Sequence, residues 1–502
     1  MTDARPLVQT TCGAVRGAWR GGSAAFYGIP FAQPPVGRLR FAAPAPALPW
    51  EGIRDASVPG PTPQRRPFGP VTTIPEPSFP GEETLNVNVF TPAPGDTAAR
   101  LPVLVWIHGG GFFAGSSSSP WYDGRSFNRD GVVTVALSYR LGFDGFGWIT
   151  DAPTNRGVRD MVAGLEWVRD NIASFGGDPS RVTIAGQSAG GGAVMTLVAS
   201  PLARGLFRGA ISHSGGGLTL TLEDAQRHGR ELARRAGVEP TRAGWGALSE
   251  DEVLDAQLAY QAPTALLAVT AAEQARTTLT SDGTRLPFMP LVGDDVLPVS
   301  ITAALAQGAG ADVALVAGTV AHEFTLMTAD RAEAWAGTDP VEALVAGGMD
   351  VEAARAYVAG QPELSGAALV VGQLGTDLTF RIPTLRWADA HGPRTWVYDF
   401  RWPTPLVGLA YHCLDLPFAW DLLDAEGVAA VCGDRPPQDL ADAMHGAWVR
   451  FITSGDPGWN AWDGHNPRVF GGSADTYGPT ADRYGPAADT YEPTRTLAAT
   501  LT

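Results

Sequence analysis

One short segment constrains the fold of this chain more than any other feature. Residues 181–199 read RVTIAGQSAGGGAVMTLVA, a β-type run followed by a tight turn around Ser188 and then by a helix-type run. A G-x-S-x-G turn between a strand and a helix exposes the serine hydroxyl at the edge of a sheet. The pattern also arises by chance in a chain with 61 glycines, but the strand before it and the helix after it argue against chance. Ser188 is therefore the candidate nucleophile.

Short β-type runs alternate with helix-type runs along most of the 502 residues. Apolar residues recur at helical spacing in 158–172 and 439–454, and Gly455 stands where a glycine ends many helices. This alternation predicts the α/β class, with a central, mostly parallel sheet and helices on both of its faces. Several β-type runs are apolar on both faces, as buried parallel strands are; the runs are 102–107, 131–139, 181–186, 208–214, 312–318 and 395–400.

The chain is expected to form a single domain over residues 1–502, with an irregular tail at 471–502. In the tail ADTYGP begins at 474, ADRYGP at 481 and ADTYEP at 488, which is a seven-residue repeat. Proline in every unit interrupts helices and strands. We interpret the repeat as an extended surface tail, with a docking segment as the alternative.

Composition excludes several classes of function. The formal net charge is −16, and a nucleic-acid-binding protein needs a basic face. All 36 basic residues are arginine, which excludes a Schiff-base lysine. The N-terminus lacks the apolar segment of a signal peptide and no apolar run spans a bilayer, so a soluble cytoplasmic protein is expected. Three scattered cysteines (Cys12, Cys413 and Cys432) have no metal-ligand spacing, and no cofactor is expected.

A second glycine-rich loop precedes the serine by some seventy residues. Residues 102–115 read PVLVWIHGGGFFAG, so three glycines follow a β-type run and His108. Consecutive glycines let the backbone approach a ligand and direct several N–H groups to one point. Such a loop, together with the backbone N–H of Ala189, can stabilise a negatively charged oxygen at the reacting carbon.

The base is sought among eight histidines. In strand–elbow folds of this kind the serine is followed in the chain by the acid and then by the histidine. His412 follows the β-type run 395–400, in a loop at the carboxyl edge of the predicted sheet, and is our candidate base. A hydrogen-bonded loop histidine is the alternative. His108 precedes the serine, His228 and His445 lie in helical patterns, and His391 precedes the run.

The acid is expected after the β-type run 312–318. Glu323 stands five residues beyond Gly318, where a carboxylate can hold the imidazole in one tautomer and stabilise its charged form. Asp294 and Asp330 are nearby rivals, and the residues alone leave the choice between them open.

The motifs occur in an order that resembles one family, the type-B carboxylesterases, which include the cholinesterases and the bacterial para-nitrobenzyl esterases. The segments that carry the resemblance are 26–44 (FYGIPFAQPPVGRLRFAAP), 83–90, 137–146, 171–191, 317–324, 412–418 and 448–457. It implies the α/β-hydrolase fold, a gorge leading to the site, and cofactor-free ester hydrolysis through an acyl-enzyme. It assigns the nucleophile, acid and base and three oxyanion-hole donors: Ser188, Glu323, His412, Gly110, Gly111 and Ala189.

This chain departs from the family at three places. Thr62 and Thr84 stand where many members have a disulfide, which is consistent with a reducing cytoplasm. Gln187 replaces the usual glutamate before the nucleophile, and the tail repeat has no counterpart.

The resemblance also suggests two structural ion pairs, because arginine binds a carboxylate with two parallel hydrogen bonds. The expected pairs are Arg40 with Glu82 and Arg140 with Asp178.

The expected substrate is a small ester, without nucleic-acid or membrane partners, and the oligomeric state, monomer or dimer, is left open. One rival is a cholinesterase-like scaffold protein, but such relatives lack an intact triad. A closer rival is an enzyme for an amide, a carbamate or a toxin-like ester. Five aromatic residues flank the motifs and either line an apolar pocket or belong to the core: Phe112, Phe113, Phe324, Phe418 and Trp420.

Overall fold

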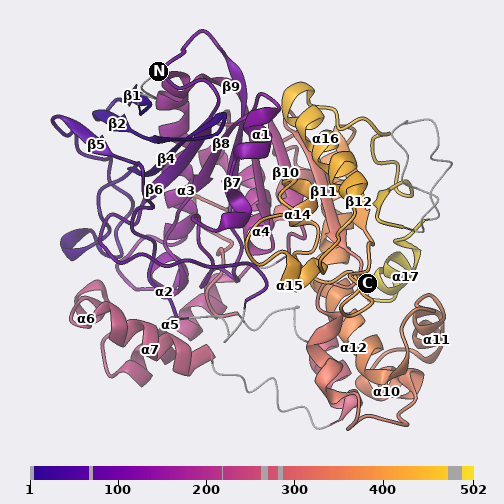
Figure 1. Cartoon of the computed structure of the whole chain (residues 1–502). Helices are drawn as coiled ribbons and strands as arrows, with labels where there is room; N and C mark the ends of the chain where they lie inside the picture. Colours follow the sequence, from indigo (N-terminus) through magenta and orange to yellow (C-terminus); the bar gives the residue numbers. More distant parts are fainter. Residues whose placement is uncertain are drawn as a thin grey trace.

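The structure is a computed structural model that describes residues 5–66, 72–217, 219–261, 270–280, 286–472 and 489–501. These residues are built around one sheet of ten strands (Figure 1). Its strands are β3 (Ala18–Arg20), β4 (Ser23–Pro30), β6 (Asn86–Thr91), β7 (Leu101–Ile107), β8 (Val133–Leu137), β9 (Gly177–Gln187), β10 (Gly209–His213), β11 (Ala314–Val320), β12 (Thr395–Phe400) and β13 (Arg468–Phe470). A small separate sheet contains β1 (Leu7–Gln9), β2 (Ala14–Arg16) and β5 (Ile53–Asp55).

Parallel pairing dominates the main sheet, whose order is β13-β12-β11-β10-β9-β7-β8-β6-β4-β3. The strands from β13 to β8 pair in parallel, and β6, β4 and β3 extend the sheet with antiparallel pairs. The predicted, mostly parallel α/β sheet is confirmed. Each predicted β-type run coincides with one of the strands from β7 to β12.

Helices cover both faces of this sheet, as the side chains of β7 show. Val103, Val105 and Ile107 pack in one apolar cluster with the two helices 156–171 and 189–199, whereas Leu104 and Trp106 pack in a second cluster with 416–419 and 438–454. Successive side chains of a strand point to opposite faces, so the two clusters lie on opposite sides of the sheet. The helices are α1 (Arg125–Arg129), α2 (Gly142–Phe146), α3 (Arg156–Asn171), α4 (Ala189–Ala199), α5 (Leu222–Ala236), α6 (Arg242–Gly246), α7 (Glu250–Gln261), α8 (Ala271–Thr280), α9 (Ile301–Ala306), α10 (Pro340–Gly347), α11 (Val351–Ala359), α12 (Gly366–Thr376), α13 (Ile382–His391), α14 (Leu416–Ala419), α15 (Ala429–Cys432), α16 (Gln438–Ser454) and α17 (Glu492–Thr500).

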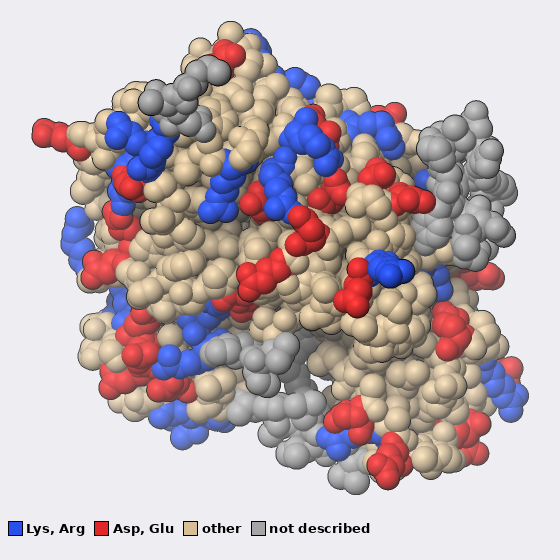
Figure 2. Space-filling model, in the orientation of Figure 1, with Lys and Arg blue, Asp and Glu red and all other residues tan. Residues whose placement is uncertain are grey.

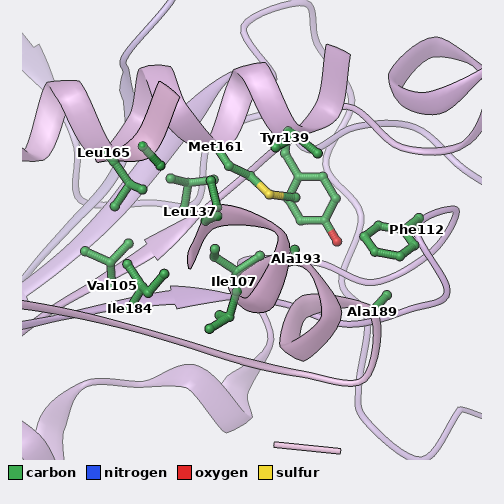
Figure 3. Packing of buried hydrophobic residues seen from close by; sticks show 14 of the residues in the cluster. Val105, Ile107, Phe112, Leu137, Tyr139, Met161, Leu165, Ile184, Ala189 and Ala193 are labelled. Atoms are coloured by element: carbon green, nitrogen blue, oxygen red, sulfur yellow. The ribbon is translucent and has the colours of Figure 1, made fainter. Parts of the chain in front are cut away.

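The first apolar cluster reaches the glycine-rich motifs (Figure 3). Met161 of α3 packs in the same buried cluster as Ile107 of β7. Phe112, which follows the glycine loop, and Ala189, the first residue of α4, belong to this cluster as well. The close-packed core therefore contacts both motifs, and this packing restricts the conformations of the loops that contain them.

The expected irregular tail needs one correction. Residues 473–488, which hold most of the repeat, lie outside the described residues. The last repeat unit, however, leads directly into α17, with Pro493 in the first turn. Proline interrupts a helix in its interior but is tolerated in the first turn, where no intrahelical N–H bond is required.

Both suggested ion pairs are wrong in their acidic partner. Arg140 pairs with Asp160 of α3 at 2.7 Å, and both side chains are almost fully buried. Arg40 contacts Asp144 at 3.3 Å. The family motifs identify both arginines, but the acidic partner of each depends on how α3 and α2 pack against the ends of the strands.

The outer surface mixes both signs of charge, with arginine and acidic side chains interspersed on the face in Figure 2. Within the described residues, every helix is too short or too polar to cross a bilayer.

Candidate active site

Ser188 lies at a strained turn between β9 and α4. Its backbone has φ 58° and ψ −124°, a conformation that side-chain-bearing residues rarely adopt. The backbone N–H of Ser188 donates to the carbonyl of His213 in β10 at 2.9 Å, which ties the turn to the neighbouring strand. Ser188 is half-exposed, whereas the residues on either side are buried. This is the geometry predicted from the sequence segment.

Glycine is required on both sides of the serine because other backbone atoms lie too close for a side chain. A Cβ on Gly186 would lie 2.5 Å from the backbone of Gly190, and a Cβ on Gly190 would lie 2.1 Å from the carbonyl oxygen of Ile107. Both distances are far below van der Waals contact, and the obstacles are backbone atoms that cannot rotate away. The small residues of the motif let strand, turn and helix cross at this spacing.

The second glycine loop lies directly against the serine. A Cβ on Gly109 would lie 3.1 Å from Cβ of Ser188. The next two glycines, Gly110 and Gly111, have φ values of 112° and 61°, in the region that favours glycine. Ala189 is the first residue of α4, so its N–H group has no intrahelical acceptor. The loop and the start of the helix thus meet beside Ser188.

His108 supports this loop as a neutral ring. Burial lowers the pKa of His108 to about 4. Its Nδ1–H donates to the carbonyl of Gly109 at 2.8 Å, and its ring stacks on Tyr139 at a centroid distance of 4.6 Å. Tyr139 in turn donates its hydroxyl to the carbonyl of His108 at 2.9 Å. These contacts fix the backbone from which Gly110 and Gly111 follow.

Glu323 and His412 meet across two strand-exit loops. Nδ1 of His412 donates to Oε2 of Glu323 at 2.5 Å, and the Glu323 side chain is fully buried. The other carboxylate oxygen accepts the N–H of Val320, the last residue of β11, at 2.7 Å. The backbone N–H of His412 also donates to the carbonyl of Glu323 at 3.1 Å. The carboxylate therefore fixes both the position and the tautomer of the ring.

The environment of His412 favours its charged form. Burial of the ring opposes the imidazolium, but the adjacent Glu323 carboxylate favours it, and the pKa of His412 is raised above its ordinary value of 6.5. Burial raises the pKa of the Cys413 thiol. The thiol is therefore neutral at physiological pH, and the Glu323 carboxylate is the anion that acts on the ring.

Gln187 connects the histidine to the serine turn. Its side-chain amide Nε2 lies 3.1 Å from Nε2 of His412 and donates to it, because Nδ1 carries the ring proton. Gln187 is buried and immediately precedes Ser188. Nε2 of His412 thus lies beside the serine turn. The structure joins Glu323 to His412 directly and links His412 to the serine turn through Gln187.

Two phenylalanines enclose the imidazole. The ring of Phe324 lies 5.0 Å from that of His412, and the ring of Phe380 lies 4.9 Å away. Phe324 is one of the five aromatic residues singled out in the sequence. Sequence reasoning missed Phe380, because it lies in an apolar helical stretch that gives no signal of a site. Of the other four, Phe112, Phe418 and Trp420 are fully buried core residues and Phe113 is half-buried.

The rival residues have other partners. Asp294 accepts hydrogen bonds from Thr154 and Asn155, away from the imidazole. His445 lies between the carbonyl of Ala419 and the carboxylate of Asp130. In the part of the chain that the structure describes, no group of three or more His, Cys, Asp or Glu side chains has the arrangement of a metal site.

The arrangement of the sheet and the strand–turn–helix geometry at Ser188 are those of an α/β-hydrolase. Residues 4–471 match the model of the carboxylesterase family. The chain is 34% identical to para-nitrobenzyl esterase of Bacillus subtilis (strain 168) over 91% of each protein, and 33% identical to phenmedipham hydrolase of Pseudarthrobacter oxydans over 90% of this chain and 91% of that protein. The solved carboxylesterase of Geobacillus stearothermophilus superimposes with a TM-score of 0.77 at 32% identity, covering 93% of each chain.

The chain therefore belongs to the carboxylesterase family. It is a serine carboxylic ester hydrolase that acts on small-molecule esters.

Proposed function

We propose that hydrolysis proceeds through an acyl-enzyme on Ser188, with His412 as the base and Glu323 as the acid that holds it. The observation that carries this proposal is the Glu323–His412 hydrogen bond at 2.5 Å beside the strained serine turn. Nε2 of His412 takes the proton of Ser188 Oγ as this oxygen attacks the ester carbonyl. His412 then protonates the leaving alcohol, and a water molecule releases the acid by the same steps.

The oxyanion of each tetrahedral intermediate is placed against the N–H groups of Gly110, Gly111 and Ala189. Support comes from the left-handed backbone of the two glycines and from the free first turn of α4. Each such donor typically contributes about 3 kcal/mol to the transition state. No metal ion or organic cofactor takes part in these steps.

Gln187 exchanges its role during the cycle. While the His412 ring is neutral, the amide N–H of Gln187 donates to Nε2 of His412. When His412 takes the serine proton, Nε2 becomes a donor, so the amide N–H loses this acceptor and the amide oxygen becomes the better partner.

We also propose a cytoplasmic location and no nucleic-acid partner, and both proposals rest on the sequence composition.

The test compares Ser188→Ala with Ser454→Ala, a serine exposed at the end of α16. The substrates are para-nitrobenzyl esters and short para-nitrophenyl esters. Ser188→Ala should lose at least about 10³-fold in kcat/KM, since catalysis then rests on the oxyanion donors and binding alone. Ser454→Ala should keep the native rate. Near-native turnover by Ser188→Ala, with the fold intact by circular dichroism, would disprove the assignment of the nucleophile.

A further inference from the structure

The C-terminal segment 489–501 lies beyond the part of the chain that matches the family model, which ends at residue 471. It nevertheless reaches into the interior. Tyr491 is fully buried, and Thr494 and Leu497 of α17 are each 1% exposed. We call residues 489–501 the C-terminal clamp, and its contacts lead to the two strands and the helical turn behind the candidate acid and base.

Tyr491 joins the two strands that lead to Glu323 and His412. Its hydroxyl donates to the carbonyl of Tyr398 in β12 at 2.9 Å and lies 2.7 Å from Oγ1 of Thr319 in β11. Glu323 follows the end of β11 by three residues, and the loop that carries His412 follows β12. One phenol group of the clamp therefore bridges both strands just before their functional loops.

The clamp also completes a buried cluster of charges around Arg381. The Arg381 guanidinium contacts Asp399 at 2.9 Å and Asp377 at 3.2 Å, and it lies over the ring of Tyr491 at 4.1 Å. Its Nε donates to Thr494 Oγ1 at 3.1 Å, while the hydroxyl of Thr494 donates to Asp377 at 2.8 Å. A buried ion cluster needs hydrogen bonds to its members. Thr494 supplies one to each of Arg381 and Asp377, and Tyr357 donates a further one to Asp377.

Arg381 and Asp377 are the two ends of a π-helical turn, Asp377–Arg381, and one residue between them contacts the candidate active site. Phe380 of this turn packs on the ring of His412. Thr376, just before the turn, accepts the backbone N–H of Phe324, next to Glu323, at 3.0 Å. π-turns are rare and frequently lie at functional sites. The turn thus contacts the clamp through its charged ends and the base through Phe380.

We propose that the C-terminal clamp positions the acid and the base through Arg381 and the π-turn, with Tyr491 and Thr494 as positioning residues. This proposal rests on the proposed function, in which Glu323 and His412 act on Ser188. The plain alternative is that the clamp only covers the core and adds stability. The two differ in what happens to the His412–Glu323 hydrogen bond when the clamp loses a single polar contact.

The experiment uses the full chain with Tyr491→Phe and Thr494→Val, and with Thr496→Val as the matched control. Thr496 lies in the same helix but is exposed. Tyr491→Phe keeps the ring over Arg381 and removes only the hydroxyl, so it preserves the packing of the core. The readouts, taken well below each variant's melting temperature, are kcat, KM, the pH dependence of kcat/KM, and the rate at which an organophosphate labels Ser188.

The expected result is a fall in kcat of about tenfold to a hundredfold for Tyr491→Phe and Thr494→Val, because small displacements of catalytic groups have effects of this size. KM should change little, and the acid limb of kcat/KM should move to lower pH, since a looser Glu323 contact favours the imidazolium less. Thr496→Val should behave as the native protein does.

Native kcat and an unmoved acid limb in both clamp variants, whatever their melting temperatures, would overturn the proposal and leave a stabilising role only. Organophosphate labelling of the native protein separates this result from a failure of the proposed function. If the native protein is not labelled at Ser188, the nucleophile assignment fails. If it is labelled and the clamp variants are labelled at the same rate and pH dependence, only the clamp proposal fails.

Discussion

At the scale of single residues, the imidazole of His412 lies between two side chains with different effects. Glu323 binds Nδ1 at 2.5 Å, and the Gln187 amide lies 3.1 Å from Nε2. A carboxylate beside the ring stabilises the imidazolium, whereas a neutral amide does not. The pH dependence of the reaction should therefore be set by this one ring and its two neighbours.

The first prediction concerns the native pH profile. Because the pKa of His412 is raised well above 6.5, the base is already protonated at pH values where free imidazole is not. As the pH falls, kcat/KM should decrease through an acid limb whose midpoint lies above pH 6.5. Glu323→Gln should move this midpoint to lower pH and reduce kcat. A native midpoint below 6.5 in a pH–rate series with a para-nitrophenyl ester would contradict this account.

The second prediction concerns Gln187→Glu. The carboxylate introduced beside Nε2 favours the imidazolium, so the acid limb should shift to higher pH, and cationic esters should gain relative turnover. The native enzyme should show no strong preference for choline esters. Gln187→Met, which has similar size and no charge, is the control and should not shift the limb upward. If the acid limb of Gln187→Glu stays in place or moves down, the amide serves only as a local hydrogen-bond partner.

At the scale of elements, the crossing of β9, the serine turn and α4 depends on glycine. Gly190→Ala places a Cβ 2.1 Å from the carbonyl oxygen of Ile107, so either the helix or the strand must shift. We expect a loss of about 1–3 kcal/mol in the free energy of unfolding, and a fall in kcat as Ser188 moves. Gly246→Ala in α6 is the control, because a Cβ there meets open space. Denaturant unfolding and kcat of both variants are measured. A Gly190→Ala protein with native values would show that the carbonyl oxygen of Ile107 does not lie this close to residue 190.

The pair Arg140–Asp160 holds α3 to the end of β8. Both side chains are buried, so Asp160→Ala leaves an unpaired buried cation and should cost about 3–5 kcal/mol of stability. Asp170→Ala removes an exposed partner of Arg169 and should cost less than about 1 kcal/mol. Equal melting temperatures for the two variants would show that the buried pair has no special role.

The parallel half of the sheet and the site loops could be predicted from sequence, for physical reasons that particular elements show. Runs such as 395–400 are apolar on both faces and coincide with β12, whereas β3 has only three residues and the apolar run of β4 is interrupted by Gly28 and Pro30. Glu323 and His412 were predicted because each follows a β-type run, and the family resemblance then chose Glu323 over Asp294 and Asp330. Phe380 and the partners of Arg381 were not found, because a π-turn has no sequence signature and Tyr491 lies in a repeat that resembles a tail.

At the scale of the whole molecule, the proposed chemistry uses only side chains and backbone groups of the chain itself. Four segments meet at one edge of the sheet: the serine turn, the glycine loop and the two strand-exit loops. The C-terminal clamp packs against the strands that lead to the two strand-exit loops. Activity should therefore be unchanged after dialysis against EDTA. Loss of activity in the chelator that one specific metal restores would show that a metal ion takes part.

In the proposed reaction Ser188 forms the covalent intermediate. The most direct measurement is mass spectrometry of the native protein after reaction with an organophosphate ester. We expect one phosphoryl adduct per chain, on the peptide that contains Ser188, with loss of activity in proportion to labelling and no adduct on the Ser188→Ala protein. Complete inactivation with the adduct on another residue, or full activity with Ser188 fully labelled, would contradict it.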